Sequence, residues 1–73
     1  MNVPTIDIQQ TGANIKALRK EAGIKVKDVA DMLGVSPQAV AKWQAGTALP
    51  TIDNLVILAA MLDTKIDDIL VIA

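Results

Sequence analysis

A chain of 73 residues forms at most one domain, and its net charge of −1 argues against a generic polyanion binder. It contains no cysteine and no histidine, so disulfides, thiolate zinc sites and imidazole ligands are excluded. Hydrophobic residues make up 52% of the chain and aromatic residues 1%, which predicts an aliphatic core with an apolar surplus for self-association.

The charge is divided unevenly along the chain. Residues 14–50 carry six basic and three acidic side chains, whereas residues 51–73 carry one basic and four acidic side chains. The first segment could therefore meet phosphates while the second points away, although a solvated mixed surface is the simpler interpretation. The longest apolar run, Leu55–Leu62, is far shorter than the ~20 residues of a membrane span, and residues 1–7 lack a signal-peptide pattern. We expect a cytoplasmic protein with no membrane partner.

Residues 1–11 are expected to form an N-terminal arm. The weak alternation within Val3–Ile8 would also suit a short strand. A first helix is predicted over residues 12–22, because Thr11 can cap its start and Gly23 can end it in the left-handed conformation. Its apolar stripe consists of Ile15, Leu18 and Ala22.

A second helix is predicted over residues 26–33, and Gly34 ends it. Its start is poorly capped, because Lys25 has no side-chain acceptor and places a cation at the positive end of the helix. Asp28 in the first turn partly offsets this charge. The apolar stripe of this helix consists of Val26, Val29, Ala30 and Leu33.

A third helix is predicted over residues 37–45, with a well-marked start. Ser36 can cap it, and Pro37 at the first position loses no helical hydrogen bond. Gly46 follows its last residue and can end it. The residues that face inward on this helix are Val40 and Trp43.

A fourth helix is predicted over residues 52–62, with Thr51 as its cap. It is apolar nearly all round, so it is either central or shared with a partner. Thr64 and Asp67 form a variant of a capping box at the start of a fifth helix. The apolar residues of that helix are Ile66, Ile69, Leu70 and Val71. Five short helices thus account for residues 12–72.

The second and third helices carry the features of a helix-turn-helix. Ala30 provides the small side chain that two closely crossing helices need. Gly34, four residues later, tolerates the positive φ of the turn, and Val40 follows as a β-branched anchor to the core. This arrangement lays one helix in the major groove while the other braces it across the DNA backbone.

Over residues 12–71 the sequence resembles the Cro and phage-repressor type of helix-turn-helix, the XRE family. The resembling stretches, in the order of the family, are "IKALRKEAG", "VADMLGVSPQAVAKWQAG", "LPTIDNLVILAAMLD" and "KIDDIL". The resemblance implies an all-α five-helix bundle of the phage-repressor DNA-binding domain type over residues 12–73, whose helices 2 and 3 form the helix-turn-helix. It also implies a homodimeric transcriptional regulator, of the repressor or antitoxin type, that binds palindromic double-stranded DNA.

The resemblance implies that the helix over residues 37–45 reads bases. Gln38 could pair with adenine N6 and N7, and Lys42 could donate to guanine O6 and N7, although both would also suit a solvated helix face. The implied base-contacting positions are Pro37, Gln38, Ala41 and Lys42. The starts of two helices offer free amides to phosphates, with lysines around them. The implied phosphate-contacting positions are Ser36, Val26, Lys25, Lys27, Lys16 and Ala45.

Three positions depart from the family pattern. Val26 stands where members commonly have a glutamine that holds a phosphate or braces the reading helix. Ala45 stands where a polar or basic residue is frequent, which leaves one fewer phosphate contact. Gln44 replaces the glutamate that usually pairs with the arginine of the first helix, here Arg19. The expected contact is therefore a hydrogen bond between a charged and a neutral group.

The apolar surplus of the last two helices predicts a homodimer. The expected interface residues are Val56, Ile57, Ala60, Ile69, Val71 and Ile72. An enzyme is the weakest hypothesis, because the chain has no histidine, cysteine or tyrosine, and no cofactor, metal or small-molecule ligand is inferred. The serious alternative is a protein-interaction module of the same fold with weakened or lost DNA binding. The acidic balance, Val26 and the alanines at positions 41 and 45, natural or substituted, favour this alternative, whereas Gln38, Lys42 and the basic first half count against it.

Overall fold

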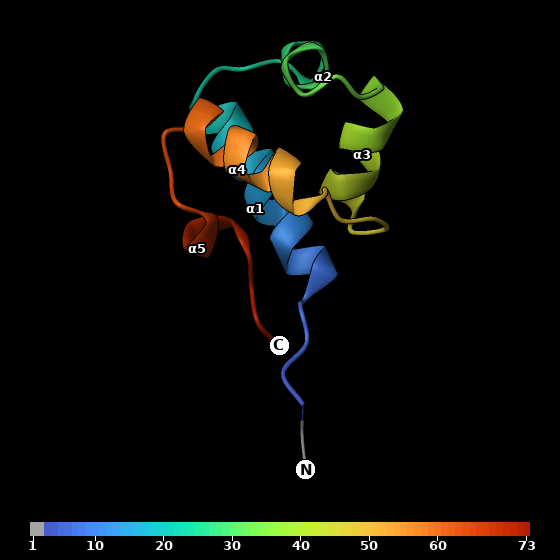
Figure 1. Cartoon of the computed structure of the whole chain (residues 1–73), viewed down its shortest axis with the longest axis vertical. Coiled ribbons are helices and arrows are strands. Elements are labelled where there is room, and N and C mark those ends of the chain that lie inside the picture. The colour runs from blue at the N-terminus through green and yellow to red at the C-terminus, as the bar shows by residue number, and fades with distance from the viewer. Residues whose placement is uncertain (1–2) are drawn as a thin grey trace.

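The computed structural model describes residues 3–73, so Met1 and Asn2 of the expected arm lie outside the described range. Five helices follow one another in this range: α1 (Ile8–Glu21), α2 (Val26–Leu33), α3 (Pro37–Ala45), α4 (Ile52–Met61) and α5 (Ile66–Ile69). Helix α1 packs against α3 and α5, and α2 packs against α3 and α4 (Figure 1). The predicted all-α, five-helix architecture is confirmed. None of the helices within residues 3–73 has the length and apolar character needed to cross a lipid bilayer.

Each of the five helices supplies at least one side chain to a single aliphatic core. Burying one such side chain stabilises the fold by about 1.5–3 kcal/mol, and the small domain depends on these contacts. Trp43, the one aromatic residue of the chain, is 5% exposed and lies in this core, as its spacing from Val40 predicts. The buried hydrophobic residues are Ile15, Val29, Ala30, Leu33, Val40, Trp43, Leu55, Leu58, Ala59, Leu62 and Ile69.

The predicted start of the first helix is wrong by four residues. Helix α1 begins at Ile8, and its N-cap is Asp7, whose carboxylate accepts a hydrogen bond from the Gln10 amide at 2.9 Å. Thr11, the expected cap, lies inside the helix and is fully buried, and its hydroxyl accepts a hydrogen bond from the Val71 amide at 3.0 Å. Asp7 and Thr11 could both cap a helix; Asp7 does so here, and the Thr11 hydroxyl binds the C-terminal segment.

The segments before α1 and after α5 pair with each other. Ile6 and Ile72 form an isolated antiparallel bridge. The Asp7 amide donates to the Val71 carbonyl and the Ala73 amide donates to the Thr5 carbonyl, both at 2.7 Å. Residues 5–7 of the expected arm are therefore held by backbone hydrogen bonds, and the segment after α5 runs back toward the segment that precedes α1 (Figure 1).

The boundaries of the middle three helices follow their predicted signals. The Ser36 hydroxyl accepts from the Ala39 amide at 3.1 Å, and the Thr51 hydroxyl accepts from the Asn54 amide at 3.2 Å. Lys25 makes no side-chain hydrogen bond as the N-cap of α2, as expected from its chemistry. Capping side chains therefore mark the starts of α3 and α4, whereas α2 starts without one.

The predicted capping box of the fifth helix is off by one residue. The N-cap of α5 is Lys65, so Asp68 occupies the third helical position in place of Asp67. One Asp68 carboxylate oxygen accepts from the Thr64 hydroxyl at 3.1 Å and from the Lys65 amide at 3.4 Å. The helix is also shorter than predicted, because it ends at Ile69 and the chain then turns toward its pairing with residues 5–7.

Helices α1 and α3 approach each other backbone to backbone. A Cβ atom added at Gly12 would collide with the carbonyl oxygen of Trp43 and lie 3.0 Å from that of Gln44. At Gly46, which caps α3, an added Cβ would lie 2.6 Å from the Cα of Gln9. Because the opposing atoms belong to the backbone, they cannot move aside as a flexible side chain would. This contact sets the position of α3 relative to the rest of the fold.

We predict that Gly12→Ala lowers the free energy of unfolding by about 3 kcal/mol, because α1 and α3 must separate to admit the methyl group. Denaturant unfolding followed by circular dichroism measures this loss. Gly23→Ala is the control, since Gly23 has a φ of +70° but open space around it, and we expect a cost of about 1 kcal/mol. Equal losses for the two variants would contradict the importance of the α1–α3 contact.

Candidate nucleic-acid interface

The turn between α2 and α3 has the geometry that a helix-turn-helix needs. Gly34 adopts the left-handed conformation with φ 66°, and the Val35 amide donates to the Ala30 carbonyl at 3.0 Å. Ala30 and Val40 are 1% and 0% exposed, so the small residue at the crossing and the anchor of the second helix both lie in the core. The three positions that predict the motif therefore have the environments the motif requires.

The outer face of α3 is open to solvent. Gln38, Ala41, Lys42 and Ala45 stand at positions i, i+3, i+4 and i+7, which places them on one face of the helix. All four are exposed, as is Pro37 at the start of the helix. The structure thus brings the base-facing positions expected from the sequence into one stripe, within which two side chains carry hydrogen-bonding groups.

At the starts of α2 and α3, the groups that could bind a phosphate are mainly backbone amides. At the start of α2 no side chain caps the first amides, so they remain available to an anion. At the start of α3, Pro37 has no amide hydrogen and the Ala39 amide is bound by Ser36, which leaves the amide of Gln38. Val26 is half-buried against the core, and only its backbone amide could reach a phosphate. Ser36 uses its hydroxyl oxygen to cap α3. Lys25 and Lys27 are exposed beside the start of α2.

Lys16 lies on the face of α1 that runs beside α3. It follows Gly12, which contacts the α3 backbone, by one helical turn, and its side chain is exposed. The expected phosphate-facing residues therefore come from three helices, while Ala45 adds only a methyl group.

Arg19 ties three elements together behind the exposed stripe. Its Nε donates to Oε1 of Gln44 on α3 at 2.8 Å, and one terminal nitrogen donates to the carbonyl oxygen of Ile24 at 2.9 Å. Ile24 precedes Lys25, the N-cap of α2. The contact expected between Arg19 and Gln44 is present, and it links α1 and α3 to the segment that starts α2.

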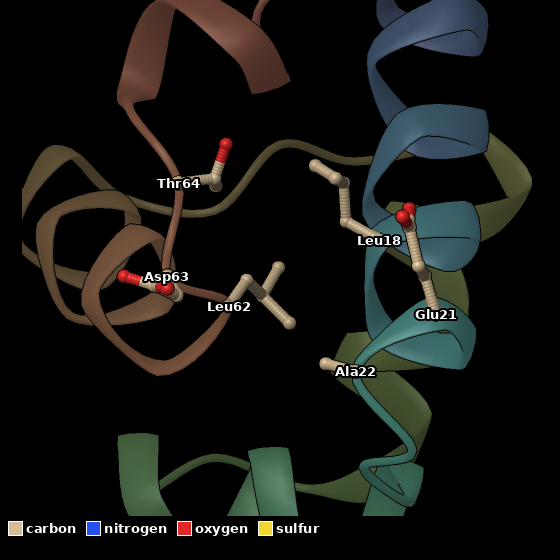
Figure 2. A pocket seen from close by; sticks show the side chains of 6 residues that line it. All are labelled: Leu18, Glu21, Ala22, Leu62, Asp63 and Thr64. Atoms are coloured by element: carbon tan, nitrogen blue, oxygen red, sulfur yellow. The ribbon is translucent and has the colours of Figure 1, made fainter.

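A separate cleft of about 300 Å³ lies between the end of α1 and the turn that follows α4. Figure 2 shows Leu18 and Leu62 pointing toward each other across it, while the Asp63 carboxylate turns away. None of its lining residues is basic, so the cleft offers no attraction to a phosphate. The residues that line it are Leu18, Glu21, Ala22, Leu62, Asp63 and Thr64.

The expected dimer residues are only partly accessible. Val56 and Ile57 on α4 are 53% and 41% exposed, and Ala60 is also exposed. Val71 is half-buried, and Ile72 lies beside Ile6 in the terminal pair. Ile69 is wrong as an interface residue, because its side chain is fully buried in the core of its own protomer.

One exposed residue of α4 was missed by sequence reasoning. Ile52 is 77% exposed and lies one turn before Val56 on the same stripe of the helix. Its spacing of four residues from Val56 was the signal that could have identified it. An apolar side chain left this open extends the unpartnered face of α4 to the start of the helix.

The crossing of α2 and α3, the left-handed turn and the exposed outer stripe define a helix-turn-helix domain of the DNA-binding regulator class. The chain belongs to the helix-turn-helix family HTH_3, whose model matches residues 15–69. The matched segment begins inside α1 and ends with the last residue of α5, so it contains the whole α2–α3 unit.

Solved structures agree with this assignment. The DNA-binding domain of the P22 c2 repressor is 31% identical, with a TM-score of 0.74, over 92% of this chain and 82% of that chain. The restriction-modification controller protein C.AhdI from Aeromonas hydrophila is 22% identical, with a TM-score of 0.77, over 86% of this chain and 96% of that chain. The clp gene regulator ClgR from C. glutamicum is 18% identical, with a TM-score of 0.76, over 89% of this chain and 84% of that chain. No curated protein sequence matches the chain.

Proposed function

We propose that this protein is a sequence-specific transcriptional regulator of the repressor type, which acts in the cytoplasm and reads the major groove with α3. The observation that carries the proposal is the division of α3 into two faces. Val40 and Trp43 are buried, whereas Gln38 and Lys42 are exposed on the outer stripe. The similarity to the DNA-binding domain of the P22 c2 repressor supports DNA binding by this chain.

Gln38 and Lys42 are the proposed base-reading residues. Gln38 lies in the first turn of α3, which reaches deepest into a major groove, and its amide matches the N6 and N7 positions of adenine. Lys42, one turn later, can donate to O6 and N7 of guanine. Pro37 and Ala41 offer only apolar contact, for example with a thymine methyl group. Two side chains therefore carry most of the direct base recognition.

The proposed phosphate contacts surround this stripe. The free amides at the starts of α2 and α3 bind the DNA backbone, and the cations of Lys25, Lys27 and Lys16 add attraction. Val26 contributes its amide alone, because its side chain packs on the core. These contacts position the reading helix without specifying sequence.

The proposed oligomer is a homodimer formed by the exposed face of α4. Ile52, Val56, Ile57 and Ala60 leave an apolar face that a second copy would cover. A two-fold dimer presents its two α3 helices to a palindromic site with half-sites about 34 Å apart. Dimerisation doubles the few base contacts that each protomer offers.

A protein-interaction module is the competing function. Ala41 and Ala45 leave half of the exposed α3 stripe without hydrogen-bonding groups, and this sparseness favours the alternative. The two functions differ in a direct way, because only the regulator selects a DNA sequence and loses affinity steeply as salt rises.

We predict that selection from random duplex DNA enriches a palindrome, and that Gln38→Ala and Lys42→Ala each relax one position of it. Each loss should cost about 1–3 kcal/mol of discrimination at that base pair. Titration of the selected and the mismatched duplexes at several salt concentrations measures both the discrimination at each base pair and the salt dependence of binding. Lys65→Ala removes the same exposed cation from the start of α5 and is the matched control. Failure to enrich any sequence, together with salt-independent binding, would favour the interaction module.

We predict that Ala45→Arg tightens DNA binding and increases the magnitude of the salt slope by about 0.9, because a cation on the outer stripe of α3 gains a phosphate. Titrations at four or more salt concentrations give the slope. Ala73→Arg adds the same charge at the C-terminal end and should leave the slope unchanged. If Ala45→Arg also left the slope unchanged, position 45 would not lie near the DNA backbone.

We predict that Val56→Glu converts a dimer into a monomer, because a dimer interface on α4 would bury the new carboxylate without a partner. Sedimentation equilibrium over a range of concentrations measures the change. Met32→Glu alters a residue of α2 with 62% exposure and should leave the dimer intact. A wild-type chain that stays monomeric at high concentration would refute the α4 interface.

A further inference from the structure

The Arg19 guanidinium is held between two neutral oxygen atoms. Its partners are the side-chain amide oxygen of Gln44 at 2.8 Å and the backbone carbonyl oxygen of Ile24 at 2.9 Å. Both bonds orient the guanidinium, and neither partner carries a negative charge. Arg19 is half-buried, so water screens its charge less than it screens an exposed lysine. The charge is thus held in a fixed place without being neutralised by these partners.

The position of this charge is close to the proposed DNA-binding elements. Gln44 lies between the exposed residues Ala41 and Ala45 in the α3 sequence, and Ile24 is followed by the N-cap of α2. The guanidinium therefore lies where α3 meets the start of α2, the two elements proposed to approach DNA. A carboxylate at position 44 would place a negative charge at the same point.

We propose that Gln44 is an affinity-setting residue: its neutral amide anchors Arg19 against α3 while leaving the guanidinium charge free to attract DNA phosphates. This proposal rests on the proposed function and names one electrostatic determinant of it. Arg19 acts as a positioning residue through its two hydrogen bonds, and also as a source of positive potential behind a stripe that contains two alanines. A glutamate would hold Arg19 more tightly but cancel that potential.

Gln44→Glu tests the proposal by separating stability from DNA affinity. We expect a raised melting temperature, since a charged pair forms with Arg19, together with a three- to tenfold loss of affinity (on the order expected for one charge) in ~0.1 M salt. The magnitude of the salt slope should fall by about 0.9. Gln10→Glu makes the same chemical change at an exposed residue in the first turn of α1. This control should leave the salt slope unchanged.

Gln44→Met should lower stability without changing DNA affinity, and it keeps the test valid if the glutamate variant folds poorly. Methionine has nearly the same shape but no acceptor for Arg19, so the melting temperature should fall while the charge stays. At a temperature where the variant is fully folded, its affinity and salt slope should match those of the wild type. Duplex titration by fluorescence anisotropy and thermal unfolding by circular dichroism provide the two readouts.

The possible results discriminate between this proposal and the proposed function. A wild type with no salt-dependent DNA binding would overturn both. A wild type that binds a selected duplex, with Gln44→Glu binding equally tightly and with the same slope, would overturn only the role of Gln44. Weaker binding by Gln44→Met than by Gln44→Glu would also overturn it, because the hydrogen bond and not the charge would then govern affinity.

Discussion

The close approach of α1 and α3 is the constraint on which the rest of the structure depends. Gly12 and Gly46 allow the two backbones to touch, with Trp43 and Gln44 carbonyl groups facing the α1 glycine. Side-chain packing can adjust by changing rotamers, but two backbones in contact have little freedom to slide. The position of α3 is therefore fixed by α1, and the left-handed turn at Gly34 connects α3 to α2. The Arg19 hydrogen bonds add a second link between α1 and α3, through the side chain of Gln44, and join both to Ile24 before α2.

The residues that hold α3 in the fold are different from the residues on its exposed stripe. Val40 and Trp43 fill the core, Ser36 and Gly46 define the ends, and Gln44 binds Arg19. The exposed stripe carries none of these functions, so its residues can change without loss of the fold. This independence explains how a domain can keep the family architecture with alanine at two outward positions. It also means that fold similarity alone does not determine what the stripe recognises.

Local signals in the sequence predict most of the helix boundaries, and long-range contacts account for the errors. Ser36, Gly34 and Thr51 act within one turn, so their roles follow from sequence spacing alone. Thr11 fails as a cap because its hydroxyl is used by Val71, which is sixty residues away. The weak alternation within Val3–Ile8 is compatible with extended backbone there, but no local signal identifies Ile72 as the partner of Ile6. Ile69 was assigned to an interface because periodicity identifies an apolar face without saying which neighbour covers it.

The electrostatics of the proposed interface depend on where the basic residues lie and on the neutral residues at positions 41, 44 and 45. The net charge is −1, yet six of the seven basic residues lie between positions 14 and 50, three of them on α1 and three within residues 25–45, the α2–α3 unit. Because two of the residues on the outer stripe of α3 are alanines, the proposed interface offers few direct contacts to DNA. Each cation near α2 and α3 therefore contributes a larger share of the attraction to DNA. A neutral residue at position 44 is consistent with that requirement, because a carboxylate there would cost attraction that the stripe cannot replace. In the proposed dimer, a second copy of the chain would repeat the few contacts that α3 offers and so raise the affinity for DNA.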